Sequence, residues 1–244
     1  MNEVVKSLKN HRSIRKYTDE QVSEQQLKTI IDAAQAAPSS IGGQQVTIIA
    51  IRDKERKAKI AQLAGGQPYI DEASVFLLFC ADFNRSQIAC ELNGQEMQIQ
   101  KSVESILVGS VDVGLSMGFA IAAAESMNLG TVCIGAIRAN LEDVAEFVDA
   151  PQNVFPLVGL VVGHPADHSQ LKPRLPREAI FHNERYQSEN LRPLIEQYDK
   201  DYHGYVDQRG GEPHTWSSFV TRAYKQVYAP NVKALLKKQG FDLE

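Results

Sequence analysis

Cysteine is scarce in this chain: only Cys80, Cys90 and Cys133 occur among 244 residues, and none belongs to a C-x-x-C pair. An odd number of isolated cysteines argues against a disulfide framework and a zinc ribbon, and it suits a reducing compartment. The opening residues, Met1–Lys6, contain no apolar core of signal-peptide length. We therefore expect a cytoplasmic protein.

Long hydrophobic runs and an excess of charge are lacking as well. The most apolar short run, Val75–Ala81, is far shorter than the roughly 20 residues that span a bilayer. With 26 basic and 30 acidic residues, the net charge of −4 offers no general attraction to nucleic acid or to an anionic membrane. Neither partner is expected, and any basic patch must be local and directed at a small anion.

The chain also lacks fixed-period repeats and a Pro/Gly/Ser-rich linker, so the elements themselves must indicate the fold. Apolar spacing and turn residues predict the following elements. They are helices over 3–10, 23–38, 54–64, 96–128 and from Asn140, and strands over 46–51, 75–81, 131–137 and 155–162. The clearest helix start is the capping box of Ser23 and Gln26. Their irregular alternation predicts an α+β layered fold rather than a βαβ array.

The longest predicted helix, over 96–128, is crowded with small residues in its second half, among them Gly109, Gly114 and Gly118. A face of small residues lets another backbone approach closely. We therefore expect this helix to be central and buried on most sides.

The character of the chain changes after Gly163. Residues 164–185 form a Pro-rich polar connection, and 189–240 have the pattern of two or three amphipathic helices. This tail is either a small appended subdomain or an arm that wraps a partner, and the sequence allows both. We expect a core over 1–185 and a helical extension of the same domain over 186–244.

The first group of candidate binding residues follows the first predicted helix: His11, Arg12, Ser13 and Arg15. In an extended segment the side chains of His11, Ser13 and Arg15 point the same way and would converge on one object. Hydroxyl and cationic donors of fixed geometry suit a phosphate or the electron-rich edge of a heterocycle. A solvated basic turn is the alternative interpretation.

A second basic group is the segment Lys172-Pro173-Arg174-Leu175-Pro176-Arg177. Its prolines stiffen the backbone, so Lys172 and Arg174 are held extended with little entropy left to lose. Two cations at this spacing can hold a phosphate. The alternative is a stiff surface crossing without a ligand.

Two weaker motifs place small residues beside the end of a helix or strand. They are Gly65-Gly66-Gln67-Pro68-Tyr69 and Cys133-Ile134-Gly135-Ala136. A flat ligand could lie against such backbone, although a Gly-Gly pair is more often a plain helix terminus or turn.

The sequence also contains the patterns of two other kinds of site. Gly114-Leu115-Ser116-Met117-Gly118 matches the G-x-S-x-G pattern of serine esterases, with Asp167 and His168 as acid and base, but this stretch fits more easily inside a helix. His164, Asp167 and His168 have the spacing of metal ligands, but Pro165 interrupts any helix that would align them. We expect no metal site.

Taken in order, the motifs resemble one family, the oxygen-insensitive NADPH nitroreductases and NADPH–FMN oxidoreductases in their larger, group A form. The resemblance covers about residues 3–240. It is carried by His11–Arg15, the Gly-Gly-Gln motif at 65–67, Phe79-Cys80-Ala81-Asp82, Ala123-Ala124-Glu125-Ser126 and Lys172–Pro176.

The resemblance implies FMN as the cofactor and NADPH or NADH as a transient electron donor. It assigns His11, Ser13, Lys172 and Arg174 to the FMN phosphate and ribityl chain, with Arg12 beside them. It assigns Arg15 and Gln67 to the pyrimidine edge of the flavin, and Ile134, Gly135 and Ala136 to the face of its ring. Ser39 and Ser40 would reach the FMN site from the partner subunit. The residues assigned to the nucleotide or substrate are Ile41, Arg138 and Arg209.

The implied fold is a mixed sheet flanked by helices around the long central helix, in an intertwined homodimer with FMN at the interface. The implied reaction is a ping-pong cycle: a nicotinamide passes hydride to the flavin N5, and nitroaromatics, quinones or free flavin are then reduced. No side chain acts as nucleophile or base; Arg15 would stabilise the negative charge of the reduced ring. The missing G-x-G-x-x-G pattern agrees, because no Rossmann crevice is needed.

Three departures from the family pattern bear on specificity. Ala136 replaces the second glycine of a pair, Arg209 is the main cation where relatives are often arginine-rich, and Ile41 lies where they often have serine or an aromatic residue. The physiological acceptor and the preference for NADPH or NADH therefore stay open. An FMN-binding or storage protein without turnover is the alternative function, since a binding site and an active site look alike in sequence.

Overall fold

The computed structural model describes residues 1–167 and 169–243, in two compact units. The larger unit comprises Met1–Ser169 and Ala229–Glu244, and the smaller comprises Gln170–Tyr228. The smaller unit is thus an insertion in the larger one along the sequence, and the last helix belongs to the larger unit.

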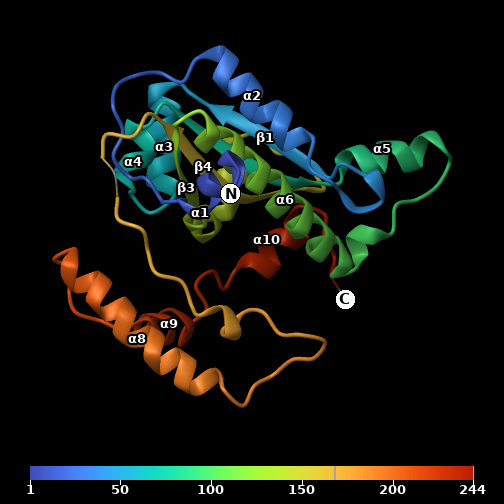
Figure 1. Cartoon of the computed structure of the whole chain (residues 1–244). Coiled ribbons are helices and arrows are strands. Elements are labelled where there is room, and N and C mark those ends of the chain that lie inside the picture. The colour runs from blue at the N-terminus through green and yellow to red at the C-terminus, as the bar shows by residue number, and fades with distance from the viewer. Residues whose placement is uncertain (168, 244) are drawn as a thin grey trace. The chain divides into compact units, whose positions relative to one another are not determined.

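Helices dominate both units (Figure 1). They are α1 (Glu3–Lys9), α2 (Glu24–Gln35), α3 (Lys54–Leu63), α4 (Pro68–Glu72), α5 (Asn84–Leu92), α6 (Glu104–Ser126), α7 (Leu141–Phe147), α8 (Leu191–Gln208), α9 (Trp216–Tyr224) and α10 (Val232–Lys238). Short 3₁₀ helices cover Ser40–Gly42, Ile99–Lys101, Ala136–Asn140 and Arg177–Ala179. The helix start expected at Ser23 is confirmed, with both hydrogen bonds of the capping box to Gln26 present.

The sheet of the larger unit contains β1 (Val46–Ile51), β2 (Val75–Asp82), β3 (Gly130–Ile134) and β4 (Val154–Gly163), in the order β1-β2-β4-β3. All three neighbouring pairs are antiparallel. The expectation of a mixed sheet is therefore wrong for these four strands. Among the described residues, the only parallel contact is the isolated bridge between Ser13 and Thr131 at the edge of β3.

Every residue of β2 is buried, because helices cover both faces of the sheet. One face packs against α2, α6 and α10 through residues such as Leu77 and Phe79. The opposite face packs against α3, α4 and α7 through residues such as Phe76 and Leu78. This alternation gives three layers, as the expected α+β layered fold requires.

The long helix α6 is confirmed, although it begins at Glu104 rather than at 96, and it is buried along one side only. Its buried residues include Gly109, where an added Cβ would lie 2.8 Å from the Cβ of Ala81, so this glycine permits a close approach to β2. The opposite side exposes large apolar residues, so the expectation of burial on most sides is wrong for the single chain. Among the described helices, α6 also has the length and composition to span a membrane, a test that core helices of soluble proteins pass too.

Candidate functional site

The segment His11–Arg15 runs extended along the free edge of β3. Helix α1 ends at Lys9, and the Ile14 amide then donates to the Thr131 carbonyl at 2.9 Å. Gly130 makes room for the segment, since a Cβ there would lie 2.8 Å from the buried Ile14 side chain. The extended conformation expected for the first basic motif is therefore present.

His11 is held by Glu125, a residue near the C-terminal end of α6. The imidazole Nδ1 lies 2.6 Å from Glu125 Oε1, and the hydroxyl of Thr131 donates to the same oxygen at 3.1 Å. The Glu125 side chain is largely buried, with 12% of it exposed. The Ala-Ala-Glu-Ser motif carries part of the family resemblance, but its residues alone indicate no role for Glu125.

Arg15 is linked to the Gly-Gly-Gln motif through Tyr69, which lies in the first turn of α4. The guanidinium carbon lies 5.9 Å from the centre of the Tyr69 ring, and the Tyr69 hydroxyl donates to Gln67 Oε1. The Gln67 amide nitrogen in turn donates to the Ala64 carbonyl at 2.7 Å. The structure thus brings together Arg15 and Gln67, two of the predicted residues. Tyr69 was not among them, because only the fold places it under Arg15.

The fourth motif lies where β3 ends and turns into a 3₁₀ helix. The strand was expected to continue to 137 but stops at Ile134, whose side chain is buried in the core. Gly135 leaves space for the Arg138 guanidinium, 3.1 Å from where a Cβ would lie. Arg138 Nη1 donates to the Leu157 carbonyl at 2.9 Å, so part of this guanidinium is committed to the protein.

The thiol of Cys133, one of the residues of this motif, reaches the surface. The strand alternation turns this side chain away from the core that holds its neighbours Val132 and Ile134. Partial burial, and secondarily the negative charge of Glu125, raise the pKa of the Cys133 thiol above its usual value. Cys80, by contrast, is buried in β2.

A cavity of about 1150 Å³ lies between α1 and α6. It is lined by Arg12 and Ile14, the even-numbered residues of the extended segment, and by small and apolar residues of α6 such as Gly118 and Phe119. The buried Nε of Arg12 has no hydrogen-bond partner among the described residues. Arg12 therefore faces a different space from that expected for the odd-numbered residues.

The predicted loop residues Ser39, Ser40 and Ile41 lie after α2. The Ser40 amide donates to the carboxylate of the buried Asp112 in α6, and the Ser39 hydroxyl accepts from the Gln44 amide at 3.0 Å. The loop is thus fixed at both ends.

The remaining predicted cations lie in the smaller unit. Lys172 Nζ lies 5.0 Å from the centre of the Tyr202 ring, and Arg174 Nη1 donates to the Lys172 carbonyl at 3.0 Å. Arg209 donates to the Tyr205 hydroxyl at 2.7 Å and lies over the same ring. Each cation is therefore held against its own unit, with Lys172 and Arg174 both exposed.

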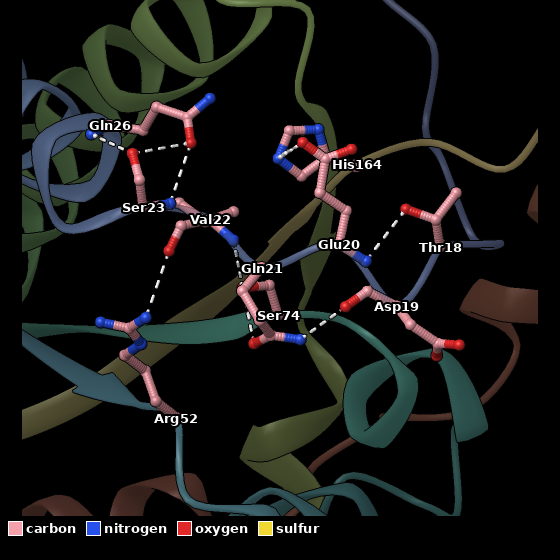
Figure 2. Close-up of polar contacts among 10 residues, drawn as sticks. All are labelled: Thr18, Asp19, Glu20, Gln21, Val22, Ser23, Gln26, Arg52, Ser74 and His164. Carbon is pink, nitrogen blue, oxygen red and sulfur yellow. Dashed lines mark hydrogen bonds and ion pairs between the residues drawn. The ribbon is translucent and has the colours of Figure 1, made fainter.

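The segment that follows the basic motif is anchored by the polar contacts in Figure 2. The Thr18 amide donates to the His164 carbonyl at 2.9 Å. The His164 ring lies 3.5 Å from the Glu20 carboxylate, as Figure 2 shows. The Val22 amide donates to the buried Ser74 hydroxyl at 2.7 Å. These contacts hold the chain that leads away from Arg15.

The two alternative sites are not supported by the described residues. Ser116 lies within α6, buried, and its hydroxyl donates to the Ala34 carbonyl at 3.0 Å, so no strand–turn–helix presents a nucleophile. His164 pairs with Glu20, whereas Asp167 lies 3.7 Å from Lys16. His168, the third member of both hypotheses, lies outside the described residues.

Comparisons with known proteins agree with the resemblance carried by the motifs. The model of the nitroreductase family matches residues 8–164, and that of the nitroreductase family C-terminal domain matches 172–244. The FMN reductase (NAD(P)H) of Bacillus subtilis is 54% identical over the whole of both chains. The oxygen-insensitive NADPH nitroreductase of Salmonella typhimurium is 39% identical over 99% of each.

Comparison with a solved structure supports the same family. The NADPH:FMN oxidoreductase from Vibrio harveyi complexed with NAD⁺ superposes with a TM-score of 0.89, at 35% identity and over 100% of both chains. The predicted family is confirmed. The chain belongs to the nitroreductase family.

Proposed function

We propose that the chain is an FMN-dependent NAD(P)H oxidoreductase that reduces nitroaromatics, quinones or free flavin. The names of its relatives, an FMN reductase and an NADPH nitroreductase, support this class of reaction. The structural observation that carries it is the convergence of separate motifs along one edge of β3: His11–Arg15 lies against Thr131, and Arg15 lies over Tyr69 beside Gln67.

The chemistry of this donor set fits FMN. His11, Ser13 and Arg15 offer an imidazole, a hydroxyl and a guanidinium from alternate positions of one extended segment, which suits a phosphate and the polar edge of a ring. Lys172 and Arg174 would add two exposed cations to the phosphate.

The other assigned residues complete the proposed site. Gln67 would meet the pyrimidine edge, and Ile134, Gly135 and Ala136 would back the ring with their main chain, because the Ile134 side chain is buried. Ser39 and Ser40 would come from a second copy of the chain.

When bound, FMN supplies the redox chemistry by accepting hydride from a nicotinamide and passing electrons to the acceptor. The protein would orient the reactants and tune the charge. The Arg15 guanidinium would stabilise negative charge at the ring edge, and its stacking on Tyr69 restrains it there. Ile41, Arg138 and Arg209 are proposed to contact the nucleotide or the acceptor, with Arg209 as the cation for NADPH.

A homodimer is part of this proposal. Exposed apolar side chains recur every fourth residue from the N-cap of α6 onward: Val103, Leu107, Val111, Leu115 and Phe119. Successive residues at this spacing are neighbours on a helix, so the five form a continuous stripe, and a contiguous exposed apolar surface is typical of a protein interface. We propose that a second copy covers this face and the adjoining cavity. We further propose a cytoplasmic location, which the free thiols of the described residues suit.

The absorption spectrum of the purified protein tests the function. We expect flavin bands that bleach when NADPH or NADH is added without oxygen, and bleaching by one nucleotide identifies the donor. Steady-state oxidation of that nucleotide with nitrofurazone, a quinone or free FMN separates an oxidoreductase from an FMN-storage protein. A colourless protein that takes up no FMN would refute the proposal.

Sedimentation velocity tests the dimer. Leu107→Glu and Val111→Glu place charges on the exposed face of α6 and should shift the protein toward monomer with loss of bound flavin. Leu92→Glu is the control, because Leu92 is 82% exposed on α5, outside this face. If the natural chain sediments as a monomer with full activity, the dimer is excluded.

A further inference from the structure

We infer that Glu125 is a positioning residue that sets the orientation and tautomer of His11 for the bound cofactor. The carboxylate holds Nδ1–H toward the protein and turns Nε2 to the FMN phosphate, to which this nitrogen donates once it also carries a proton. This inference rests on the proposed FMN site, and it gives a role to the Ala-Ala-Glu-Ser motif, which the proposed function leaves without one.

The contact between His11 and Glu125 is short in space, joins residues far apart in sequence, and is largely shielded from solvent. Nδ1 of His11 lies 2.6 Å from Oε1 of Glu125, a residue 114 positions away in sequence. Thr131, fully buried, donates to the same oxygen at 3.1 Å. The carboxylate therefore accepts two hydrogen bonds from two different segments. Thr131 donates from β3, and His11 donates from the extended segment His11–Arg15 that carries the proposed cofactor ligands.

The position of Glu125 in its helix is electrostatically unfavourable without a cation. Glu125 is the penultimate residue of α6, where the partial negative charge of the helix end disfavours a carboxylate. A largely buried carboxylate also loses hydration, and this loss must be offset by hydrogen bonds or by an opposite charge. Thr131 supplies a neutral donor only, so His11 is the partner that can balance the charge.

The backbone around His11 is fixed independently of Glu125. The Ile14 amide donates to the Thr131 carbonyl, and Ser13 forms the parallel bridge to the same residue. What the backbone leaves free is the rotation of the imidazole and the choice of the nitrogen that carries the proton. Because the hydrogen bond made by one ring nitrogen decides the state of the other, Glu125 determines both.

Flavin affinity tests this role. The dissociation constant of FMN is measured by recovery of flavin fluorescence on dilution of the holoprotein, for the natural chain and for Glu125→Leu, His11→Asn and the double variant. Glu125→Leu should weaken FMN binding at least about tenfold, as loss of the outer partner of a ligating histidine does at metal sites. The double variant should bind no more weakly than His11→Asn alone, because both changes remove one contact.

Two further variants separate positioning from folding. Glu125→Gln keeps the shape and an oxygen that accepts from Nδ1–H, so its loss of affinity should be smaller than that of Glu125→Leu. Glu104→Gln, an exposed carboxylate at the opposite end of α6, should leave FMN affinity unchanged.

The imidazole tautomer gives a readout that a merely structural role would not move. In protein labelled with ¹⁵N-histidine, the His11 signals are identified among the six histidines by their absence in His11→Asn. At a pH where the ring is neutral, we expect the proton on Nδ1 in the natural chain and in Glu125→Gln, and a different distribution in Glu125→Leu. If Glu125→Leu does not fold, the tautomer of the natural chain and the affinity of Glu125→Gln carry the test.

The outcomes are distinct. A natural chain that binds no FMN refutes the proposed function and this inference with it. A natural chain that binds FMN refutes the inference alone if the neutral His11 ring carries its single proton on Nε2, or if Glu125→Leu binds FMN as tightly as the natural chain. Additive losses in the double variant would also overturn it, because they would mean that the two residues act separately.

Discussion

The backbone amide of Ser40 donates to the carboxylate of Asp112, at 3.1 Å to Oδ1, and ties the loop after α2 to the middle of α6. The next residue, Ile41, has φ of 51° and is 98% exposed. A β-branched residue in the left-handed region is strained and persists only where its surroundings hold it. The buried carboxylate is such a restraint, and it keeps an apolar side chain in solvent at a position we assign to nucleotide or acceptor.

Asp112→Ala should therefore act on both stability and specificity. Loss of the buried acceptor leaves the Ser40 amide without its partner, and we expect a fall of about 1–3 kcal/mol in the free energy of unfolding. The relaxed loop should also change KM for the acceptor more than kcat. Urea unfolding and steady-state kinetics check both expectations.

Two variants control this prediction. Asp112→Asn keeps an accepting oxygen and should lose less stability than Asp112→Ala. Asp32→Ala removes an exposed carboxylate of α2 and should change stability by no more than about 0.5 kcal/mol. If Asp112→Ala and Asp32→Ala changed the free energy of unfolding equally, the hydrogen bond from Ser40 to Asp112 would not contribute to stability.

Gly130→Ala should loosen the extended segment of the proposed site. The new Cβ would lie 2.8 Å from the buried Ile14 side chain, and such overpacking costs about 1–3 kcal/mol, partly offset by a less flexible unfolded chain. FMN affinity should fall with stability, because His11, Ser13 and Arg15 move with Ile14.

A glycine-to-alanine substitution at another position should have the opposite effect on stability. Gly204 lies within α8, and a Cβ there meets nothing within 4 Å. Gly204→Ala should stabilise the protein by up to about 1 kcal/mol, because alanine favours the helix. Thermal unfolding and flavin fluorescence compare the two variants; a Gly130→Ala protein with natural FMN affinity would contradict the proposed placement.

Locally encoded features could be predicted from the sequence. The capping box at Ser23 and the bounds of β1 depend on neighbouring residues, so pattern and composition are sufficient for them. The extended form of His11–Arg15 also followed from a short segment. The early end of β3 did not, because Gly135 begins a 3₁₀ helix where apolar residues continue.

Features that depend on distant partners could not be predicted. The roles of Glu125 and Tyr69 exist only because α6 and α4 bring them to His11 and Arg15. The exposed side of α6 was predicted to be buried for a related reason. Apolar composition indicates that side chains are buried, but it does not distinguish burial within one chain from burial against a second copy.

Cys133 provides a chemical probe of Glu125. Partial burial and the Glu125 charge raise the pKa of this thiol, so its alkylation by iodoacetamide should rise at a higher pH than for an ordinary thiol. Glu125→Gln removes the second cause and should move the profile to lower pH. A raised thiol pKa also stabilises the folded state at pH values below that of the free thiol, and this contribution is lost as pH rises through the folded pKa.

The probe needs a background with one accessible thiol. Cys80 is buried in β2, and burial raises its pKa to about 12, so it should not react. Cys90 is half-buried and is replaced in Cys90→Ser. Mass spectrometry of the alkylated peptide gives the rate at Cys133, and an unchanged profile in Glu125→Gln would mean that the charge does not reach the thiol.

Tyr69 links Arg15 to Gln67, and two substitutions separate its ring from its hydroxyl. Tyr69→Phe keeps the ring under the guanidinium but removes the donor to Gln67 Oε1, whereas Tyr69→Leu removes both. A cation over an aromatic ring is worth about 0.5–1 kcal/mol at an exposed site, so Tyr69→Leu should weaken FMN binding several-fold. If Arg15 tunes the ring, Tyr69→Leu should also lower the flavin reduction potential, because the positive charge near the reduced ring becomes less fixed.

The matched control removes another pair of the same kind. Arg56 lies 4.4 Å from the centre of the Phe147 ring, between α3 and the end of α7. Phe147→Leu should cost comparable stability and leave both FMN affinity and reduction potential unchanged. If Tyr69→Leu behaved like Phe147→Leu, the stacking at Tyr69 would serve the fold alone, and the assignment of Arg15 to the ring edge would lose its structural support.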